Sequence, residues 1–367
     1  MKKLHIILLL FQLNICFGQQ INNKEFTDIK SKYFSNAVYI ESYLPKNVDK
    51  SGNTDYTDLV QKAVNENSKV IFPNYPILVS DKGINLISNQ YVLFQPNTQL
   101  ILKSSDKAEY KVININGVTN IKAYFLNIVG DKYKHLSGAG EWGQGVSIKS
   151  SSNIILYKPM ISKCWGDGIY IGQDTSVPQN ITVNGGLIND NRRNGISIIS
   201  GNNVTIKNVT ISNTSGHNPQ SGIDIEPNTV KNEITNVVLD SITTKNNAMH
   251  GIIISTGNLN GNIKPISITI NNHRDFNSAI ALGLSVTRNN LNYIQPLNGK
   301  IVITNSDYNV PGKAFIRNYQ GKKSNIILSL KNMNFKRSNA ARSAANSAGS
   351  VSQFMSDFTN NKNSDVR

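Results

Sequence analysis

The sequence predicts an all-β fold, a right-handed parallel β-helix (solenoid) with a short N-terminal capping helix. Five segments begin with a glycine followed by alternating apolar residues, at Gly145, Gly168, Gly195, Gly222 and Gly251. These glycines lie 23, 27, 27 and 29 residues apart. A period of this size indicates stacked repeats that bury apolar residues against their neighbours. Each repeat also holds two further short apolar runs, such as 204–206 and 209–211, so one repeat corresponds to one three-stranded coil.

The first element is a predicted secretory signal at residues 1–18. Lys2 and Lys3 precede the apolar run 6–11, and Cys16-Phe17-Gly18 ends the segment with small residues at the −3 and −1 positions,. Cleavage near Gly18 predicts a secreted or periplasmic protein. The alternative is lipid attachment at Cys16, which the bulky Ile15 before it disfavours. No later stretch reaches the ~20 apolar residues of a membrane span.

A lead segment, 19–49, precedes a predicted capping helix at 55–66. Leu59, Val60, Ala63 and Val64 have helical spacing there,. A cap is expected because an uncovered first coil exposes unpaired strand edges. The segments 54–57, 61–64 and the Phe72-Pro73 turn resemble the opening segment of the pectate-lyase superfamily, close to its rhamnogalacturonase/epimerase-like branch. That resemblance covers about residues 50–330 and implies a β-helix closed by a short helix.

Coils are predicted over residues 50–335, followed by a low-complexity tail at 336–367. The tail is rich in Ser, Ala and Asn, and a short helix near 353–358 is expected to cover the last coil. After signal cleavage only Cys164 remains, which excludes an internal disulfide and is expected to pack inward. The formal charge of +15, less Lys2 and Lys3, leaves +13.

This charge predicts an acidic polysaccharide partner, with compositional drift as the alternative,. Lys and Arg are spread along the chain and no nucleic-acid-binding module is present, so we expect no nucleic-acid partner,.

Alternation within the glycine strands places three candidate carboxylates on one outer face. Ser147, Tyr170, Ser197, Asp224 and Ile253 form one predicted outward column. Lys149, Gly172, Ile199, Glu226 and Ser255 form the next, and Gln144, Asp167, Asn194, Ser221 and His250 a third. Coils lie ~4.8 Å apart, so Asp167, Asp224, Glu226 and His250 are expected to share one stretch of wall, with His217 just upstream.

Polar and aromatic residues near this wall are the predicted substrate-binding groups. Aromatic rings stack on sugars, and arginine pairs with carboxylates or sulfates. The predicted binding residues are Arg192, Arg193, Trp142, Trp165 and Tyr170. The insertion 131–144, which holds His135, Glu141 and Trp142, is expected to overhang the same face. The alternatives are structural: a salt bridge from Arg192 or Arg193 to the carboxylates, and packing roles for the tryptophans.

The segment Gly166-Asp167-Gly168 is similar to the first catalytic segment of polygalacturonase-type hydrolases. The next coil reads Arg192-Arg193-Asn194-Gly195 and lacks that family's Asp-Asp pair, and Gly216-His217-Asn218 only echoes its Gly-His-Gly segment. Hydrolysis by another pair remains open, because inversion needs carboxyl groups ~6.5–9.5 Å apart. Lyase or epimerase chemistry would instead use arginine to neutralise the substrate, with histidine or tyrosine as the base.

These residues predict an exported enzyme that processes an acidic polysaccharide. A glycoside hydrolase is favoured, with Asp167, Asp224, Glu226, His217 and His250 as the catalytic candidates. The alternatives are a polysaccharide lyase or C5-epimerase on the same scaffold, and a non-catalytic glycan- or surface-binding β-helix. No cofactor is specified. If calcium is used, Asp224 and Glu226 would supply its oxygen ligands,.

Overall fold

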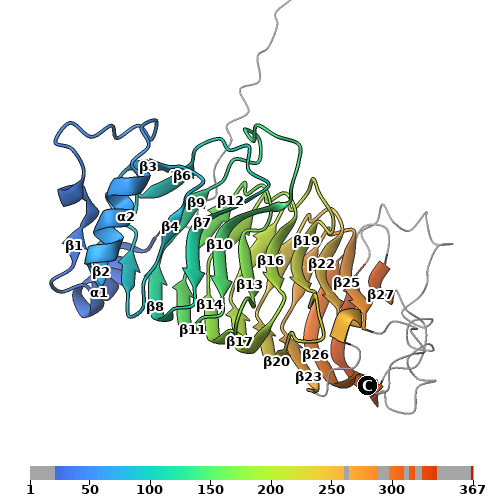
Figure 1. The fold of residues 1–367 in the computed structure, drawn as a ribbon. Helices are drawn as coiled ribbons and strands as arrows, with labels where there is room; N and C mark the ends of the chain where they lie inside the picture. Colours follow the sequence, from blue (N-terminus) through green and yellow to red (C-terminus); the bar gives the residue numbers. More distant parts are fainter. Residues whose placement is uncertain are drawn as a thin grey trace, which may run out of the picture.

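The computed structural model describes residues 21–259, 264–286, 297–309, 314–318, 325–336 and 365–366. They form a solenoid whose coils stack from the N-terminal to the C-terminal end (Figure 1). Each regular coil contributes three strands, as in β10 (Trp142–Lys149), β11 (Ser152–Tyr157) and β12 (Met160–Ser162). The predicted all-β parallel β-helix is therefore confirmed.

One strand of each coil joins a nine-stranded parallel sheet, sheet B. Its strands are β4 (Ile84–Asn85), β7 (Glu109–Asn116), β10, β13 (Ile169–Gly172), β16 (Asn194–Ile198), β19 (Ser221–Ile225), β22 (His250–Ser255), β25 (Ile280–Ser285) and β27 (Ala314–Asn318). All five glycine-led segments belong to this sheet, in β10, at the start of β13, and in β16, β19 and β22.

The other two strands of each coil join a 20-stranded sheet, sheet A. Its first row is β1 (Val38–Tyr39), β2 (Lys69–Ile71), β5 (Tyr91–Leu93), β8 (Thr119–Tyr124), β11, β14 (Gln179–Asn184), β17 (Gly201–Lys207), β20 (Ile234–Asp240), β23 (Ile266–Asn271), β26 (Asn298–Asn309) and β28 (Asn325–Lys336). Its second row is β3 (Pro76–Val79), β6 (Gln99–Leu102), β9 (Asn127–Val129), β12, β15 (Leu187–Asn189), β18 (Thr210–Ser212), β21 (Thr243–Lys245) and β24 (Arg274–Phe276), and β29 (Asp365–Val366) pairs with β28.

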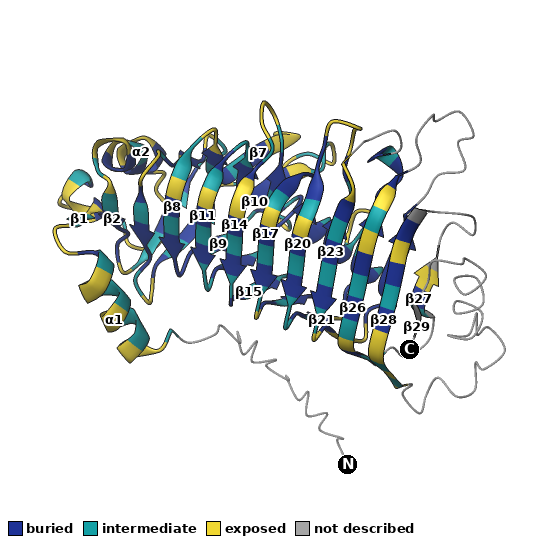
Figure 2. Cartoon of the chain, turned by 90° about the horizontal axis from the view of Figure 1, so that it is seen from below, coloured by how far each residue is buried: buried dark blue, intermediate teal, exposed yellow. Residues whose placement is uncertain are grey.

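The core is a set of inward columns that follow from this register. Ile169, Ile196, Ile223 and Ile252 are paired coil to coil and are fully buried. This is the predicted single stack. Cys164 is also fully buried, as expected. Burial alternates along the strands of sheet A, which Figure 2 shows as bands, whereas β16 and β19 of sheet B are buried throughout.

One corner of the core is polar. The inward column Ile188–Ile211–Thr244–Asp275 changes from apolar to polar side chains toward the C-terminal end. Thr244 Oγ1 donates to Asp275 Oδ2 at 2.6 Å and contacts His273 Nε2 at 2.8 Å. Asp275 Oδ1 accepts from the backbone N–H of Ser278 at 3.1 Å. Both carboxyl oxygens of this buried acid therefore have partners.

The N-terminal end of the solenoid carries the predicted helix, α2 (Thr57–Glu66), which buries Val60, Ala63 and Val64 (Figure 1). Its prediction at 55–66 is confirmed. Asp55 Oδ1 accepts from the backbone N–H of Thr57 at 3.0 Å and so satisfies a free donor of the first turn,. The short helices η1 (Ile40–Tyr43) and η2 (Gly257–Leu259) complete the helical elements described besides α1.

The lead segment contains a helix that the sequence analysis does not predict, α1 (Asn23–Tyr33). Asn22 caps it by accepting from the backbone N–H groups of Lys24 and Glu25,. Tyr33 stacks on Tyr124 with ring centroids 5.7 Å apart, and Glu25 accepts from Tyr157. These contacts hold α1 against the outer face of sheet A, below α2 in Figure 1.

Three regions of the prediction fall wholly or largely outside the described residues. They are the signal peptide at 1–18, the tail segment 337–364, and the short helix expected near 353–358. Within the described residues, no helix is long and apolar enough to cross a membrane. The strand β1 is paired into sheet A upstream of residue 50, where the first coil was predicted to begin.

Candidate functional site

The candidate site lies on the outer face of sheet B, over β10 to β22. The register aligns Ser147, Tyr170, Ser197, Asp224 and Ile253 on successive coils, as the outward column requires. This column is nevertheless mostly buried, since Asp224 exposes only 1% of its surface and Ser147 and Ser197 none. The face is thus outward in register but covered by neighbouring side chains.

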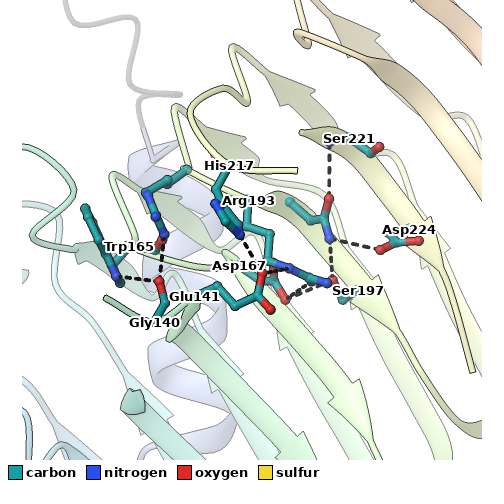
Figure 3. A network of polar contacts seen from close by, with 11 residues as sticks. Gly140, Glu141, Trp165, Asp167, Arg193, Ser197, His217, Ser221 and Asp224 are labelled. Atoms are coloured by element: carbon teal, nitrogen blue, oxygen red, sulfur yellow. Dashed lines mark hydrogen bonds and ion pairs between the residues drawn. The ribbon is translucent and has the colours of Figure 1, made fainter. Parts of the chain in front are cut away.

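A chain of hydrogen bonds joins Asp167 to Asp224 across two coils (Figure 3). Ser197 Oγ donates to Asp167 Oδ2 at 2.9 Å. Asn194 Nδ2 donates to Ser197 Oγ and to Asp224 Oδ2, both at 3.0 Å. Asn194 Oδ1 accepts from the backbone N–H of Ser221 at 3.2 Å. Asn194 therefore fixes one oxygen of Asp224 and orients the serine that holds Asp167.

Arg193 links this chain to the insertion 131–144 (Figure 3). Its Nη1 lies 3.3 Å from Asp167 Oδ2, and its Nε lies 3.3 Å from Glu141 Oε2. The same Glu141 oxygen lies 2.9 Å from His217 Nε2. The insertion overhangs this face as expected, and the predicted alternative of a salt bridge exists, although its described partner on sheet B is Asp167 and not Asp224.

The two aspartates differ in their electrostatics. Burial raises the pKa of Asp167, opposed by Arg193 beside it. Burial, and then the negative charge of Glu226, raise the pKa of Asp224 well above its usual range. Asp224 Oδ1 is buried and has no hydrogen-bond partner. Burial of an acid without a partner favours its neutral form, so Asp224 holds a proton more readily than an ordinary aspartate.

Two further polar atoms on this face are also buried without partners, Gln144 Oε1 and Ser147 Oγ. Buried polar groups in folded proteins almost always have partners, so each exception calls for an explanation. Three such atoms lie on the sheet B strands β10 and β19. The other such atoms among the described residues are His135 Nε2, Asn191 Nδ2 and Thr214 Oγ1.

Glu226 follows the last residue of β19 and is half-buried. It lies close enough to Asp224, two residues earlier, for its negative charge to raise the pKa of that aspartate. Tyr170 is also half-buried, with Lys149 Nζ 5.5 Å from its ring centroid. Burial raises the pKa of Tyr170 to about 12, so its hydroxyl is protonated at neutral pH.

Trp165 does not offer the free ring that a sugar platform requires, which corrects its predicted role. The His135 ring stacks on it with centroids 4.0 Å apart, and the Arg192 guanidinium lies 3.6 Å from its centroid. Two groups this close to one centroid must occupy opposite ring faces. Trp165 Nε1 also donates to the carbonyl of Gly140 at 3.1 Å. The ring therefore anchors the insertion, whereas Trp142 is exposed at its end.

His250 is buried at the start of β22, where its Nδ1 lies 3.1 Å from Ser221 Oγ. Burial, and then Arg317, lower the pKa of His250 to about 4, so this ring is neutral at neutral pH. The described residues contain no group of three or more His, Cys, Asp or Glu arranged to hold a metal ion. Asp224 and Glu226 are thus only two of the ligands that calcium would need.

Sequence reasoning gave no role to Asn194 and Ser197, although both lie on the predicted outward columns. Their importance comes from side-chain contacts between coils, which a single sequence does not display. The sequence predicts His135 only as part of the insertion, without a role of its own. Its Nδ1 lies 2.8 Å from Asp131 Oδ2, and Tyr110 donates to the other oxygen of Asp131. The spacing of Asp131 and His135 was the available signal for this anchor.

Residues 60–237 match the profile of the family described as right handed beta helix region. The fold of the described residues agrees with that description, because their strands stack as a parallel β-helix. Two uncharacterized proteins of Bacillus subtilis (strain 168) are similar to this chain. The SPbeta prophage-derived YorA is 25% identical, over 39% of this chain and 28% of its own length. YclG is 26% identical, over 49% of this chain and 36% of its own length. The chain thus aligns with about a third of each relative.

Several solved structures share the fold at low sequence identity. A tailspike of Acinetobacter baumannii bacteriophage Fri1, a capsular polysaccharide depolymerase, has a TM-score of 0.60 and 17% identity over 82% of this β-helix chain and 57% of its own. The mannuronan C-5 epimerase module of Azotobacter vinelandii has a TM-score of 0.59 and 13% identity, and the match covers 83% of this chain and 87% of the module. A polygalacturonase of Erwinia carotovora has a TM-score of 0.58 and 14% identity, and the match covers 80% of this chain and 93% of the polygalacturonase. These likenesses show the parallel β-helix fold that the sequence predicts.

Proposed function

We propose that this β-helix protein is an exported enzyme that hydrolyses an acidic polysaccharide on the outer face of sheet B. The observation that carries the proposal is the asymmetry of Asp224. One of its oxygens is held by Asn194, while the other is buried without a partner, and its pKa is raised. A carboxyl group that binds its proton more tightly and is oriented in this way has the properties of a general acid.

Glu226 is the partner that suits this acid best. Asp167 is bound by Arg193 and Ser197, so its carboxylate is already engaged. Glu226 is more exposed than Asp167. Strand alternation predicts its side chain on the same face as that of Asp224, with the two backbones ~7 Å apart. Carboxyl groups extending from these positions can reach the ~6.5–9.5 Å separation of an inverting pair, which leaves room for a water between sugar and base. Asp224 protonates the leaving oxygen, and Glu226 removes a proton from the attacking water.

The residues around this pair would bind the charged groups of the substrate and position it. Arg193 lies beside the acids, whereas Arg192 is held on the Trp165 ring. The mature charge of +13 favours an anionic chain,. His217 and the exposed Trp142 lie at the insertion where a polymer would approach. Because Asp224 is 1% exposed, the proposal requires a local opening over it when the glycan binds. The three structural neighbours described above are named as polysaccharide-active proteins, which supports this substrate class.

Lyase or epimerase chemistry is the second candidate, and the observation that favours it is His250. His250 is neutral at pH 7, as a base must be, although its lowered pKa makes it a weaker base than an ordinary histidine,. Both of those reactions begin by removal of the proton next to the uronate carboxylate. A β-helix that only binds glycans is the third candidate, in which no single residue of the network controls turnover.

One assay separates the three candidates. The purified protein is incubated with polygalacturonate, alginate and hyaluronate, and reducing ends, unsaturated uronate absorbance and C5 configuration are recorded. New reducing ends without unsaturated product support hydrolysis, and their loss in Asp224→Asn assigns it to this site. Unsaturated product, or inverted C5 centres without cleavage, contradicts the hydrolase and selects the lyase or epimerase. Binding without any product contradicts both.

A further inference from the structure

A hollow of ligand size lies on the outer face of sheet A, away from the proposed catalytic face. It has a volume of ≈ 530 Å³, within the ~300–1,000 Å³ of ordinary ligand sites. Its floor is the outward column Tyr91, Lys122, Ile155 and Thr182, on β5, β8, β11 and β14. We call this hollow the sheet A trough.

One wall of the sheet A trough is a ladder of asparagines in the left-handed conformation. Asn89, Asn120, Asn153 and Asn180 have φ between 57° and 62°. Each amide donates to the carbonyl oxygen of the previous one, at 2.7, 3.0 and 3.0 Å. An amide has two N–H donors and two acceptor lone pairs. The ladder uses one of each per residue, and these bonds are exposed, so a row of donors and acceptors repeats at the coil spacing of ~4.8 Å.

Lys122 supplies a positive charge held in place on the floor. Its Nζ lies 5.1 Å from the ring centroid of Tyr91 and 5.6 Å from that of Tyr33 on α1. Lys69 Nζ lies 5.8 Å from the same Tyr91 ring. In the described part of the chain, neither lysine forms an ion pair with a carboxylate. Two tyrosine rings restrict Lys122 while leaving its charge without an acidic partner.

The other side of the trough is bounded by α1. A further hollow of ≈ 520 Å³ lies between α1 and strands β8 and β11, and it shares Ile155 with the trough. The floor thus combines an apolar side chain with a fixed cation, between a row of amides and a helix. Sugar rings present C–H groups, hydroxyls and, in acidic glycans, carboxylates or sulfates to such a surface.

We propose that the sheet A trough is a second binding site for an anionic polysaccharide, in which Lys122 pairs with an acidic group and the asparagine ladder bonds hydroxyls of successive sugars. The substrate class rests on the proposed function. The site itself is separate from the catalytic face, so it acts by holding the polymer and not by chemistry.

The test measures the binding of polygalacturonate, alginate and hyaluronate in the Asp224→Asn background, with dextran as the neutral comparator. For whichever of these polymers the parent protein binds, Lys122→Gln is expected to lower the affinity about tenfold, as for the loss of one charge-assisted contact. Asn153→Gly keeps the left-handed backbone while removing the amide, and is expected to weaken it about fivefold. Lys300→Gln, on the same sheet several coils away, removes the same charge and is the matched control, with less than about a twofold effect.

Equal binding by the parent and by Lys122→Gln would overturn the proposal, and so would an equal loss in Lys300→Gln. A single-stranded DNA homopolymer that binds as tightly through Lys122 would identify a general polyanion surface and overturn it as well. Turnover is measured separately on wild-type protein and the Lys122→Gln single variant, using short oligosaccharides. If the wild-type protein turns over substrate but Lys122→Gln binds polymer as well as the parent, only the trough proposal is rejected. If binding depends on Lys122 but the wild-type protein shows no turnover, only the catalytic proposal is rejected.

Discussion

Two buried acids, in different parts of the solenoid, show what separates a structural carboxyl group from a candidate functional one. Asp275 lies in the polar corner of the core, and Asp224 lies on the outer face of sheet B. They are 0% and 1% exposed. Burial raises the pKa of Asp275 to about 6, and burial with Glu226 raises that of Asp224 well above its usual range. Burial and a raised pKa are therefore common to both.

The difference lies in their hydrogen bonds. Both oxygens of Asp275 accept hydrogen bonds, from Thr244 and from the Ser278 backbone, whereas one oxygen of Asp224 accepts none. Leaving a buried polar atom unpaired costs ~1–3 kcal/mol, a cost that the core avoids at Asp275. An unpaired oxygen thus marks a candidate site better than burial or pKa does.

The largest expected effect is on stability, when a mutation places an aspartate in the apolar core where it has no hydrogen-bond partner. Ile223 precedes Asp224 and is fully buried between Ile196 and Ile252. Ile223→Asp is expected to lower the free energy of unfolding by about 5 kcal/mol or more, measured by urea unfolding. Thr205→Asp, outward on sheet A, is the control and should stay within about 0.5 kcal/mol. Equal midpoints for Ile223→Asp and wild type would show that this register is wrong.

The inward column that this variant tests was predictable because two periods combine. Alternation along a strand sets the face, and the glycine spacing sets the coil, so Ile223 could be placed next to Ile196 from the sequence alone. The outward columns followed from the same logic. The helix α1 did not, although Asn22 followed by Glu25 is a recognisable capping pattern,.

The site was less predictable because its contacts are not periodic. The insertion 131–144 folds over the face and brings Glu141 to Arg193, and no repeat fixes where it lands. Its stacking on Trp165 also turned a predicted sugar platform into an anchor. Likewise, the sequence places Asn194 beside Asp224 but does not reveal which amide atom meets which carboxyl oxygen.

The second prediction compares the two acids directly by activity. Asp224→Asn is expected to lower kcat about 10³-fold, equivalent to about 4 kcal/mol, because it removes the proton donor while keeping the shape. Asp275→Asn should leave kcat within about threefold, since its partners lie in the core. Both are measured on the polyuronate that the wild-type protein converts. Near-normal turnover by Asp224→Asn, with loss in Arg193→Ala or His250→Ala, would replace the carboxylate mechanism with the lyase or epimerase.

The third prediction is that the contribution of Asp275 to the free energy of unfolding depends on pH. An acid whose pKa is raised on folding binds more protons in the native state, here between pH 3.8 and about 6. Its contribution to stability therefore falls as pH rises through that window, by up to about 3 kcal/mol. Burial lowers the pKa of His273 to about 3, which has the opposite effect, because stability is then lost as pH falls below 6.5.

The difference in unfolding free energy between wild type and Asp275→Asn isolates the aspartate from this opposing histidine. The stability of wild type relative to the variant should decline between pH 4 and pH 6.5 and level off above it. Urea unfolding at successive pH values measures this difference. A difference that does not change with pH would mean that the hydrogen bonds of Asp275 offset its burial fully.

The smallest expected effect belongs to the rim of the site, where His217 contacts Glu141 at 2.9 Å with 45% of its side chain exposed. Exposed ion pairs contribute ~0.2–1 kcal/mol, so His217→Ala should lower kcat/KM less than about threefold and leave the unfolding midpoint unchanged. Glu141→Gln is the matched comparison, because it weakens the contacts to both His217 and Arg193, and we expect a larger loss. If His217→Ala instead lowers kcat/KM tenfold or more while Glu141→Gln does not, His217 touches the substrate itself, and an exposed rim residue would then matter more than the buried network around Asp224.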